Sequence, residues 1–336
     1  MNSPAWHREV LERLMGRRPR LPHALLVSGR PGIGKVAFAR EFARSLLCES
    51  PIDLLACGEC PSCHWFGQSN HPDYREIVPE AAEEGDGEAV EAETGKDSAK
   101  KSLVIKIDQV RAIRDFVSLS THRAGHRAIV LHPAEALQPA AANALLKTLE
   151  EPPPATVILL VSDRPARLLA TIRSRCESVA LRAPARDEAL AWLAEGGATD
   201  AEASLALAGG APLLAADLAR PEEREWRRKV VAELSRPDGA HVLPFAAGMD
   251  RANLDRTIFV MQTWVHDLVR LKYASGPRHH IEAAAALKAK ARRARLDRLL
   301  ALDRELLEAR RLAGHPLNAR LAAEHLMMAY NRATLG

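Results

Sequence analysis

A glycine-rich turn between an expected strand and an expected helix restricts the fold of this sequence more than any other feature. The apolar run at residues 24–27 is typical of a buried strand, and residues 36–47 are expected to form a helix. The turn between them reads Gly-Arg-Pro-Gly-Ile-Gly-Lys-Val at residues 29–36. Glycines in such a turn let backbone N–H groups surround a phosphate at the start of a helix. The pattern therefore predicts a phosphate-binding loop (P-loop) within an α/β domain.

The candidate nucleotide-binding residues of this loop are Gly29, Gly32, Gly34 and Lys35. The eighth position of an active loop is Ser or Thr, whose hydroxyl binds Mg²⁺. Here that position is Val36, whose side chain offers no metal ligand. A glycine-rich turn without any ligand stays an alternative, because motif matches of this kind include false positives.

A second expected element of a nucleotide hydrolase is also missing. In an active site the strand expected at residues 128–131 would end in Asp-Glu, one carboxylate holding the metal and the other orienting water. His132 and Pro133 occupy these positions and can do neither. Glu135 or Asp163 could substitute only if the strand register differs. We therefore expect that ATP or ADP binding is possible but that the chain does not hydrolyse ATP.

Strands and helices alternate through the first half of the chain. Further strands are expected at residues 74–78 and 156–161, and helices at residues 107–119 and 140–150. Such alternation predicts a parallel sheet with helices on both faces. Residues 80–102 interrupt it with a mostly Ala, Glu, Gly, Asp and Lys segment, which we expect to be a solvated, disordered insertion.

The second half of the chain is expected to be helical. We predict a nucleotide-binding domain at residues 1–166, a small helical domain at 167–208 and a larger helical domain at 209–336. Amphipathic stretches at residues 258–271 and 296–312 would pack this last domain. A hydrophobic content of 47% with only 4% aromatic residues suits Ala- and Leu-rich helices.

Composition excludes few functions but points to the cytoplasm. The net charge of +4 gives only weak long-range attraction to nucleic acid. A zinc protein that binds DNA directly through Arg17, Arg18 and Arg20 stays an alternative, although such a cluster is more often a solvated turn. No apolar run approaches the 18 or so residues that cross a bilayer, and the first residues lack the pattern of a signal peptide. We expect a cytoplasmic protein without a membrane partner.

Four cysteines lie within sixteen positions, and we call residues 48–63 the cysteine module. The candidate metal ligands are the thiolates of Cys48, Cys57, Cys60 and Cys63. Two overlapping Cys-x-x-Cys turns suit adjacent corners of tetrahedral zinc. A redox role is the alternative, and His64 could replace one thiolate. With four protein ligands, a single Zn²⁺ would be structural.

Two further segments carry a family resemblance. Residues 143–153 read Asn-Ala-Leu-Leu-Lys-Thr-Leu-Glu-Glu-Pro-Pro, and residues 174–176 read Ser-Arg-Cys. Together with the cysteines placed after the first helix of the P-loop, these segments resemble the AAA+ clamp-loader subunits of bacterial DNA polymerase III. The weakened P-loop is similar to that of delta-prime subunits, whereas the gamma/tau motor subunits keep intact residues.

This resemblance implies an architecture and a role. The expected parts are an AAA+ nucleotide domain, a helical lid and a helical collar that joins the subunits. By resemblance, Arg175 is the arginine finger that reaches the ATP of a neighbouring subunit, because a guanidinium can stabilise phosphate charge as it shifts during transfer. The implied partners are the gamma/tau motor subunits and the delta subunit, and, through the complex, the sliding clamp and primed DNA.

Other interpretations stay open for the same residues. An active gamma/tau-type ATPase is the main alternative function. Arg175 could instead make a structural ion pair, and Cys176 beside it is more often a core residue than a ligand. Active family members carry an arginine that senses nucleotide near the lid's last helix, and residues 209–214 contain none.

Overall fold

The computed structural model divides the chain into two compact units, Met1–Ala183 and Pro184–Gly336. The residues that it describes are 4–82, 102–118, 125–312 and 318–335. Among these residues, no helix is both long and apolar enough to cross a membrane. The expected first boundary at residue 166 precedes the last strand of the sheet, and the division into three domains stays a proposal.

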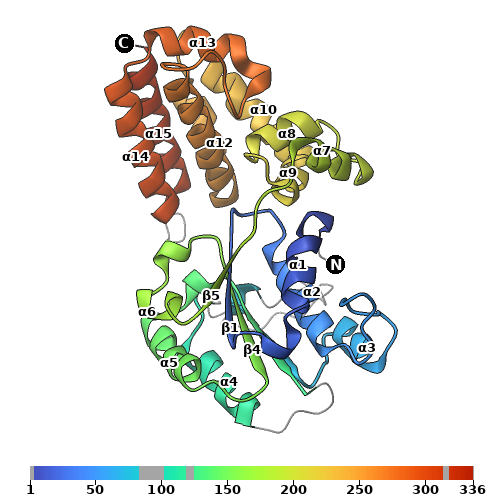
Figure 1. The fold of residues 1–336 in the computed structure, drawn as a ribbon. Helices are drawn as coiled ribbons and strands as arrows, with labels where there is room; N and C mark the ends of the chain where they lie inside the picture. Colours follow the sequence, from blue (N-terminus) through green and yellow to red (C-terminus); the bar gives the residue numbers. More distant parts are fainter. Residues whose placement is uncertain (1–3, 83–101, 119–124, 313–317, 336) are drawn as a thin grey trace, which may run out of the picture. The chain divides into compact units, whose positions relative to one another are not determined.

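The first unit is built on a five-stranded parallel sheet in the order β2-β3-β4-β1-β5 (Figure 1). Its strands are β1 (Ala24–Ser28), β2 (Tyr74–Ile77), β3 (Arg127–Leu131), β4 (Thr156–Ser162) and β5 (Glu177–Ala180). The parallel α/β sheet expected from the sequence is confirmed. Strand β5 was not predicted, because it is short and only Val179 of its four residues is buried.

Helices cover both faces of this sheet, as Figure 1 shows. The α-helices of this unit are α1 (Arg8–Met15), α2 (Lys35–Leu47), α3 (Pro61–Gly67), α4 (Ile107–Ser118), α5 (Pro139–Glu150) and α6 (Ala170–Arg173). Of these, α2 packs on one face and α4 and α5 on the other, whereas α3 contacts α2 and α6 contacts α5. Leu26, Ile129 and Ile158 point from three strands into one core with Ile113 of α4 and Leu145 of α5. Because these three strands are parallel and adjacent, the carboxyl ends of β1, β3 and β4 lie side by side. Ligands bind at this edge in open parallel sheets.

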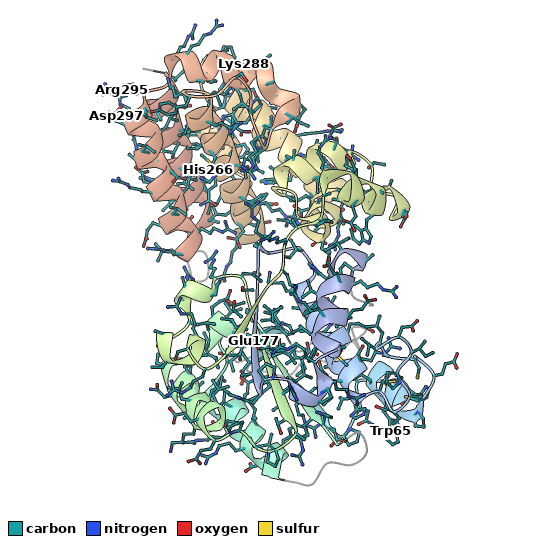
Figure 2. All side chains as sticks on the ribbon, in the orientation of Figure 1. Trp65, Glu177, His266, Lys288, Arg295 and Asp297 are labelled. Carbon is teal, nitrogen blue, oxygen red and sulfur yellow. The ribbon has the colours of Figure 1, made fainter. Side chains whose placement is uncertain are left out.

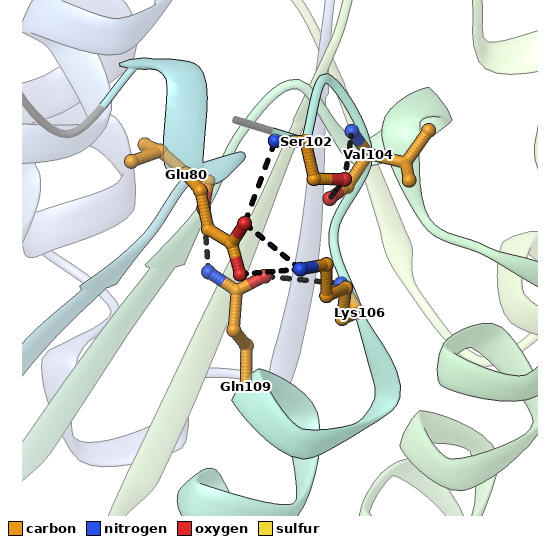
Figure 3. A network of polar contacts seen from close by, with 6 residues as sticks. Glu80, Ser102, Val104, Lys106 and Gln109 are labelled. Carbon is orange, nitrogen blue, oxygen red and sulfur yellow. Dashed lines mark hydrogen bonds and ion pairs between the residues drawn. The ribbon is translucent and has the colours of Figure 1, made fainter. Parts of the chain in front are cut away.

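The insertion was expected at residues 80–102. Residues 83–101 of it lie outside the described residues. Its two ends are described and they lie together, as Figure 3 shows. The carboxylate of Glu80 accepts hydrogen bonds from Lys106 Nζ at 2.7 and 2.8 Å and from the backbone N–H of Ser102 at 3.4 Å. The inserted segment therefore leaves the domain and rejoins it at one point after β2.

The second unit is entirely helical in its described residues and contains two hydrophobic clusters. Its helices are α7 (Arg186–Glu195), α8 (Ala201–Leu207), α9 (Pro212–Leu218), α10 (Pro221–Ser235), α11 (Val242–Ala246), α12 (Arg251–Arg270), α13 (Ala284–Arg293), α14 (Leu296–Leu312) and α15 (Ala319–Thr334). A small cluster joins α7, α8 and α9, and a larger one joins α10 to α15. In the larger cluster, Trp264 Nε1 donates to Tyr330 Oη at 3.1 Å, which satisfies a buried polar group.

Candidate functional site

The four cysteines of the cysteine module converge on one point between α2 and α3. The sulfur atoms all lie within 4.8 Å of one another. The Sγ of Cys48 lies 3.6 Å from that of Cys57 and 3.8 Å from that of Cys60, and Cys57 lies 4.0 Å from Cys63. A tetrahedron with zinc–sulfur bonds of about 2.3 Å has edges of about 3.8 Å. The donor set therefore fits one tetrahedral metal ion, and these separations are too long for disulfides.

Local backbone geometry holds the cysteine module in this shape. The N–H of Cys60 donates to the Sγ of Cys57 at 3.3 Å, and the N–H of Cys63 donates to the Sγ of Cys60 at 3.4 Å. A hydrogen bond from the Ser50 hydroxyl, helped by backbone N–H groups, lowers the pKa of Cys57 to about 6. These bonds favour the thiolate form that a metal requires at Cys57 and Cys60, whereas burial raises the pKa of Cys48 and that of Cys63.

The cysteine module is also fixed to the P-loop helix. Ser62 is buried, and its hydroxyl donates to the carbonyl of Leu47 at the end of α2 at 2.6 Å. It also lies 2.8 Å from Nε2 of the buried His71 (Figure 2 labels the neighbouring Trp65). His64, the alternative ligand, instead lies 3.1 Å from the amide nitrogen of Gln68. The four cysteines that the spacing indicated thus form a cluster that could hold a metal ion, although α3 replaces part of the expected loop.

The P-loop has the conformation that its glycines allow. Gly32 and Gly34 have φ angles of 74° and 92°, in the left-handed region that suits glycine. At Gly29 a Cβ atom would lie 2.6 Å from the carbonyl oxygen of Leu181, so only glycine fits between the loop and the chain after β5. Helix α2 begins at Lys35, as the motif requires.

Contacts within the chain hold the P-loop and its lysine. The carbonyl oxygen of Ile33 accepts hydrogen bonds from Trp6 Nε1 at 3.0 Å and from His7 Nε2 at 2.7 Å. Burial of His7 lowers its pKa, so the ring is neutral and donates from Nε2. The buried ammonium of Lys35 donates to the Arg30 carbonyl at 2.6 Å and pairs with the Asp163 carboxylate at the end of β4.

His132 lies at the end of β3, where an active site would carry a metal-binding carboxylate. Its Nε2 is 2.6 Å from Oε1 of Glu76 on β2. Glu76 also accepts hydrogen bonds from Arg40 Nε at 2.9 Å and from the Tyr74 hydroxyl at 2.9 Å. Burial favours the neutral acid, but the bonds from His132 and Arg40 outweigh it and lower the pKa of Glu76 to about 2. The hydrophobic pattern of the sequence did not predict this network, because the residues of the network come from two strands and a helix.

The two acidic residues considered as substitutes take other positions. Glu135 lies in a short 3-10 helix (Ala134–Ala136) after β3, and its Oε1 accepts a hydrogen bond from the N–H of Asp163 at 3.0 Å. Asp163 is itself paired with Lys35. The two carboxylates therefore belong to one cluster beside the P-loop.

Arg175 follows α6 and has a partly exposed guanidinium. Its Nη1 donates to the carbonyl of Thr171 at 2.9 Å, and its Nη2 lies 2.7 Å from Oε1 of Glu150 at the end of α5. The side chain of Arg175 is 35% exposed and that of Glu150 is 50% exposed. Cys176, in contrast, packs against the sheet core, and burial raises the pKa of its thiol to about 11.

Two of the three arginines in the alternative DNA-binding cluster have partners within the chain. Arg17 forms a two-pronged ion pair with Glu177 of β5 at 2.6 and 3.0 Å (Glu177 is labelled in Figure 2). Arg18 donates to the carbonyl of Leu46 at 2.8 Å. These contacts favour a structural role for this basic segment.

Four features define an AAA+-type protein with an inserted cysteine module. They are the sheet order, the P-loop between β1 and α2, the cluster of four cysteines and the helical second unit. A family model described as DNA polymerase III, delta subunit, matches residues 8–185. The DNA polymerase III subunit delta' of Pseudomonas aeruginosa is 40% identical over 230 residues, which cover 67% of this chain and 64% of that protein. The corresponding subunit of Yersinia pestis is 35% identical over 260 residues, which cover 73% of this chain and 70% of that protein. The chain belongs to the DNA polymerase III delta' subunit family.

The matched region spans just under two thirds of the Pseudomonas aeruginosa protein. A solved Thermotoga maritima protein described as DNA polymerase III gamma subunit-related aligns with 97% of this chain and 99% of its own length, with a TM-score of 0.45 and 19% identity.

Proposed function

We propose that this chain acts as the delta-prime subunit of a DNA polymerase III clamp loader and helps to load the sliding clamp onto primed DNA. Family membership is the observation that carries the proposal. The partners in this proposal are the gamma/tau motor subunits and the delta subunit, with clamp and DNA reached through the complex. The helical second unit would supply the collar contacts. The proposed lid at residues 167–208 begins within the first unit, and the proposed collar is residues 209–336.

The metal bound by the cysteine module is a single structural Zn²⁺ in this proposal. Four sulfur ligands at tetrahedral spacing suit zinc and leave no open coordination position. The metal would hold α3 against the end of α2 and would take no part in nucleotide chemistry.

The chain's own nucleotide site is silent in this proposal and supports at most ATP or ADP binding through Gly29, Gly32, Gly34 and Lys35. Val36 offers no hydroxyl to Mg²⁺. His132 offers no carboxylate, and the nearby Glu76 is already bonded to three side chains. Neither the metal nor the attacking water would therefore be held.

Arg175 would serve a neighbour's site as an arginine finger. Its guanidinium lies on the surface, as a residue acting on another subunit must. Such fingers raise the rate of nucleotide hydrolysis by ~10³- to 10⁵-fold at the site that they serve. A subunit can therefore lose its own chemistry and still complete that of its neighbour.

Reconstitution tests this function directly. The purified chain alone is expected to show no ATP turnover above background with Mg²⁺. Added to the gamma/tau and delta subunits, it is expected to complete a stable complex with DNA-stimulated turnover that complexes lacking it do not reach. Sustained turnover by the chain alone would instead support the active gamma/tau-type ATPase.

A further inference from the structure

The P-loop lysine already has an anionic partner within the chain. Lys35 is the residue that would contact phosphate, and its side chain is only 5% exposed. Its ammonium pairs with the Asp163 carboxylate and donates to the Arg30 carbonyl at 2.6 Å. The Arg30 carbonyl and the Asp163 carboxylate take two of the three N–H donors of this ammonium, so a phosphate would have to compete with the carboxylate for its single positive charge.

Asp163 is held in place for this contact. It follows β4 directly, and its backbone N–H donates to Oε1 of Glu135 at 3.0 Å. The other carboxylate oxygen, Oε2 of Glu135, is buried and has no hydrogen-bond partner within the described structure. The Asp163 carboxylate thus lies against Lys35, with Glu135 bonded to the backbone of Asp163, and its negative charge would repel that of a nucleotide phosphate.

The loop keeps its shape through other contacts. Trp6 and His7 donate to the carbonyl of Ile33, on the side of the loop where the N-terminal segment packs. Gly29 fits closely against the Leu181 carbonyl. The loop is therefore formed by protein contacts, and losing the Asp163 carboxylate would leave it folded with its lysine available.

We propose that Asp163 sets the phosphate affinity of this P-loop by occupying Lys35 as an internal carboxylate in place of a nucleotide diphosphate. Neutralising Asp163 would convert the loop into a site for nucleoside diphosphates that needs no Mg²⁺, because Val36 provides no metal ligand. This inference rests on the silent nucleotide site of the proposed function and names the residue that keeps the site empty.

The test is equilibrium binding of a fluorescent ADP analogue to the full chain without Mg²⁺, with unlabelled ADP and inorganic pyrophosphate as competitors. Asp163→Asn is expected to bind at least about tenfold more tightly than the unaltered chain, because the phosphate gains a charge-assisted hydrogen bond to Lys35 without a competing carboxylate. The gain is expected to vanish in Asp163→Asn combined with Lys35→Met. Asp217→Asn, which neutralises a surface partner of Arg220, is the matched control and is expected to change nothing.

Three outcomes would overturn the inference. One is equal affinity of Asp163→Asn and the unaltered chain. Another is a gain that persists without Lys35. The third is failure of both Asp163→Asn and Asp163→Ser to fold, which would make the contact structural only. ADP binding is measured without hydrolysis, so this test is separate from the measurement of ATP turnover by the isolated chain. Only the turnover measurement decides whether the chain's own nucleotide site is inactive.

Discussion

The guanidinium of Arg175 is bound to the carboxylate of Glu150, with 2.7 Å between Nη2 and Oε1. Both side chains are partly exposed, at 35% and 50%. Exposed ion pairs contribute only ~0–1 kcal/mol, because water competes for both charges. In the proposed function, Arg175 would therefore leave Glu150 for a neighbour's phosphate at little cost.

We predict that Glu150→Gln changes single-turnover ATP hydrolysis in the reconstituted complex by less than about fivefold, since a weak surface pair is all that is lost. Rapid-quench measurement of bound ATP after DNA addition checks this, once the variant is shown to assemble. A loss as large as that of removing the arginine would mean that Glu150 itself takes part in the neighbour's site.

We predict that Cys60→Ser removes the metal and destabilises the first unit. One zinc per chain is expected in the unaltered protein and well under one in the variant, with a melting temperature lower by about 5 to 10 °C. Elemental analysis and thermal unfolding measure both quantities. Cys176→Ser is the matched control, because that thiol lies in the sheet core away from the cluster, and it is expected to keep the full zinc content.

We predict that Glu76→Gln destabilises the protein by about 2–3 kcal/mol at pH 7, because His132 and Arg40 lose a buried anionic partner. The pKa of Glu76 is lowered from 4.5 to about 2 in the folded protein. Its stabilising contribution is therefore full above about pH 4.5 and is lost as the pH falls toward about 2.

Urea unfolding at pH 7 and pH 3.5 measures this effect, and the gap between variant and unaltered protein should narrow at the lower pH. Glu12→Gln, which removes an exposed pair with Arg8, is the control and is expected to cost less than about 0.5 kcal/mol. Equal destabilisation by the two variants would show that the Glu76 network contributes no more than a surface pair.

Local patterns were sufficient to predict much of the architecture. Cysteine spacing predicted the cluster of four cysteines, because these residues are close in the chain and two tight turns bring them together. Apolar runs identified β1, β3 and β4, whose residues are buried almost throughout. The P-loop was predicted from its glycines, which adopt left-handed conformations in the structure.

Contacts between distant segments were not predictable in this way. The pairing of Lys35 with Asp163 joins residues 128 positions apart, and nothing local to either residue indicates it. The bond between His132 and Glu76 likewise depends on β2 and β3 being neighbours. Strand β5 gave no periodic signal, because it lies at the edge of the sheet with three of its four residues exposed.

The role of Arg175 is tested most directly by single-turnover hydrolysis of ATP in the reconstituted complex with Arg175→Ala and Arg175→Lys. Both variants must first be shown to assemble and to keep their zinc. In each we predict that one class of bound ATP persists after DNA is added and is hydrolysed at least ~10³-fold more slowly, because lysine lacks the planar fork of arginine. Hydrolysis of all bound ATP at the unaltered rate in Arg175→Ala would contradict the account.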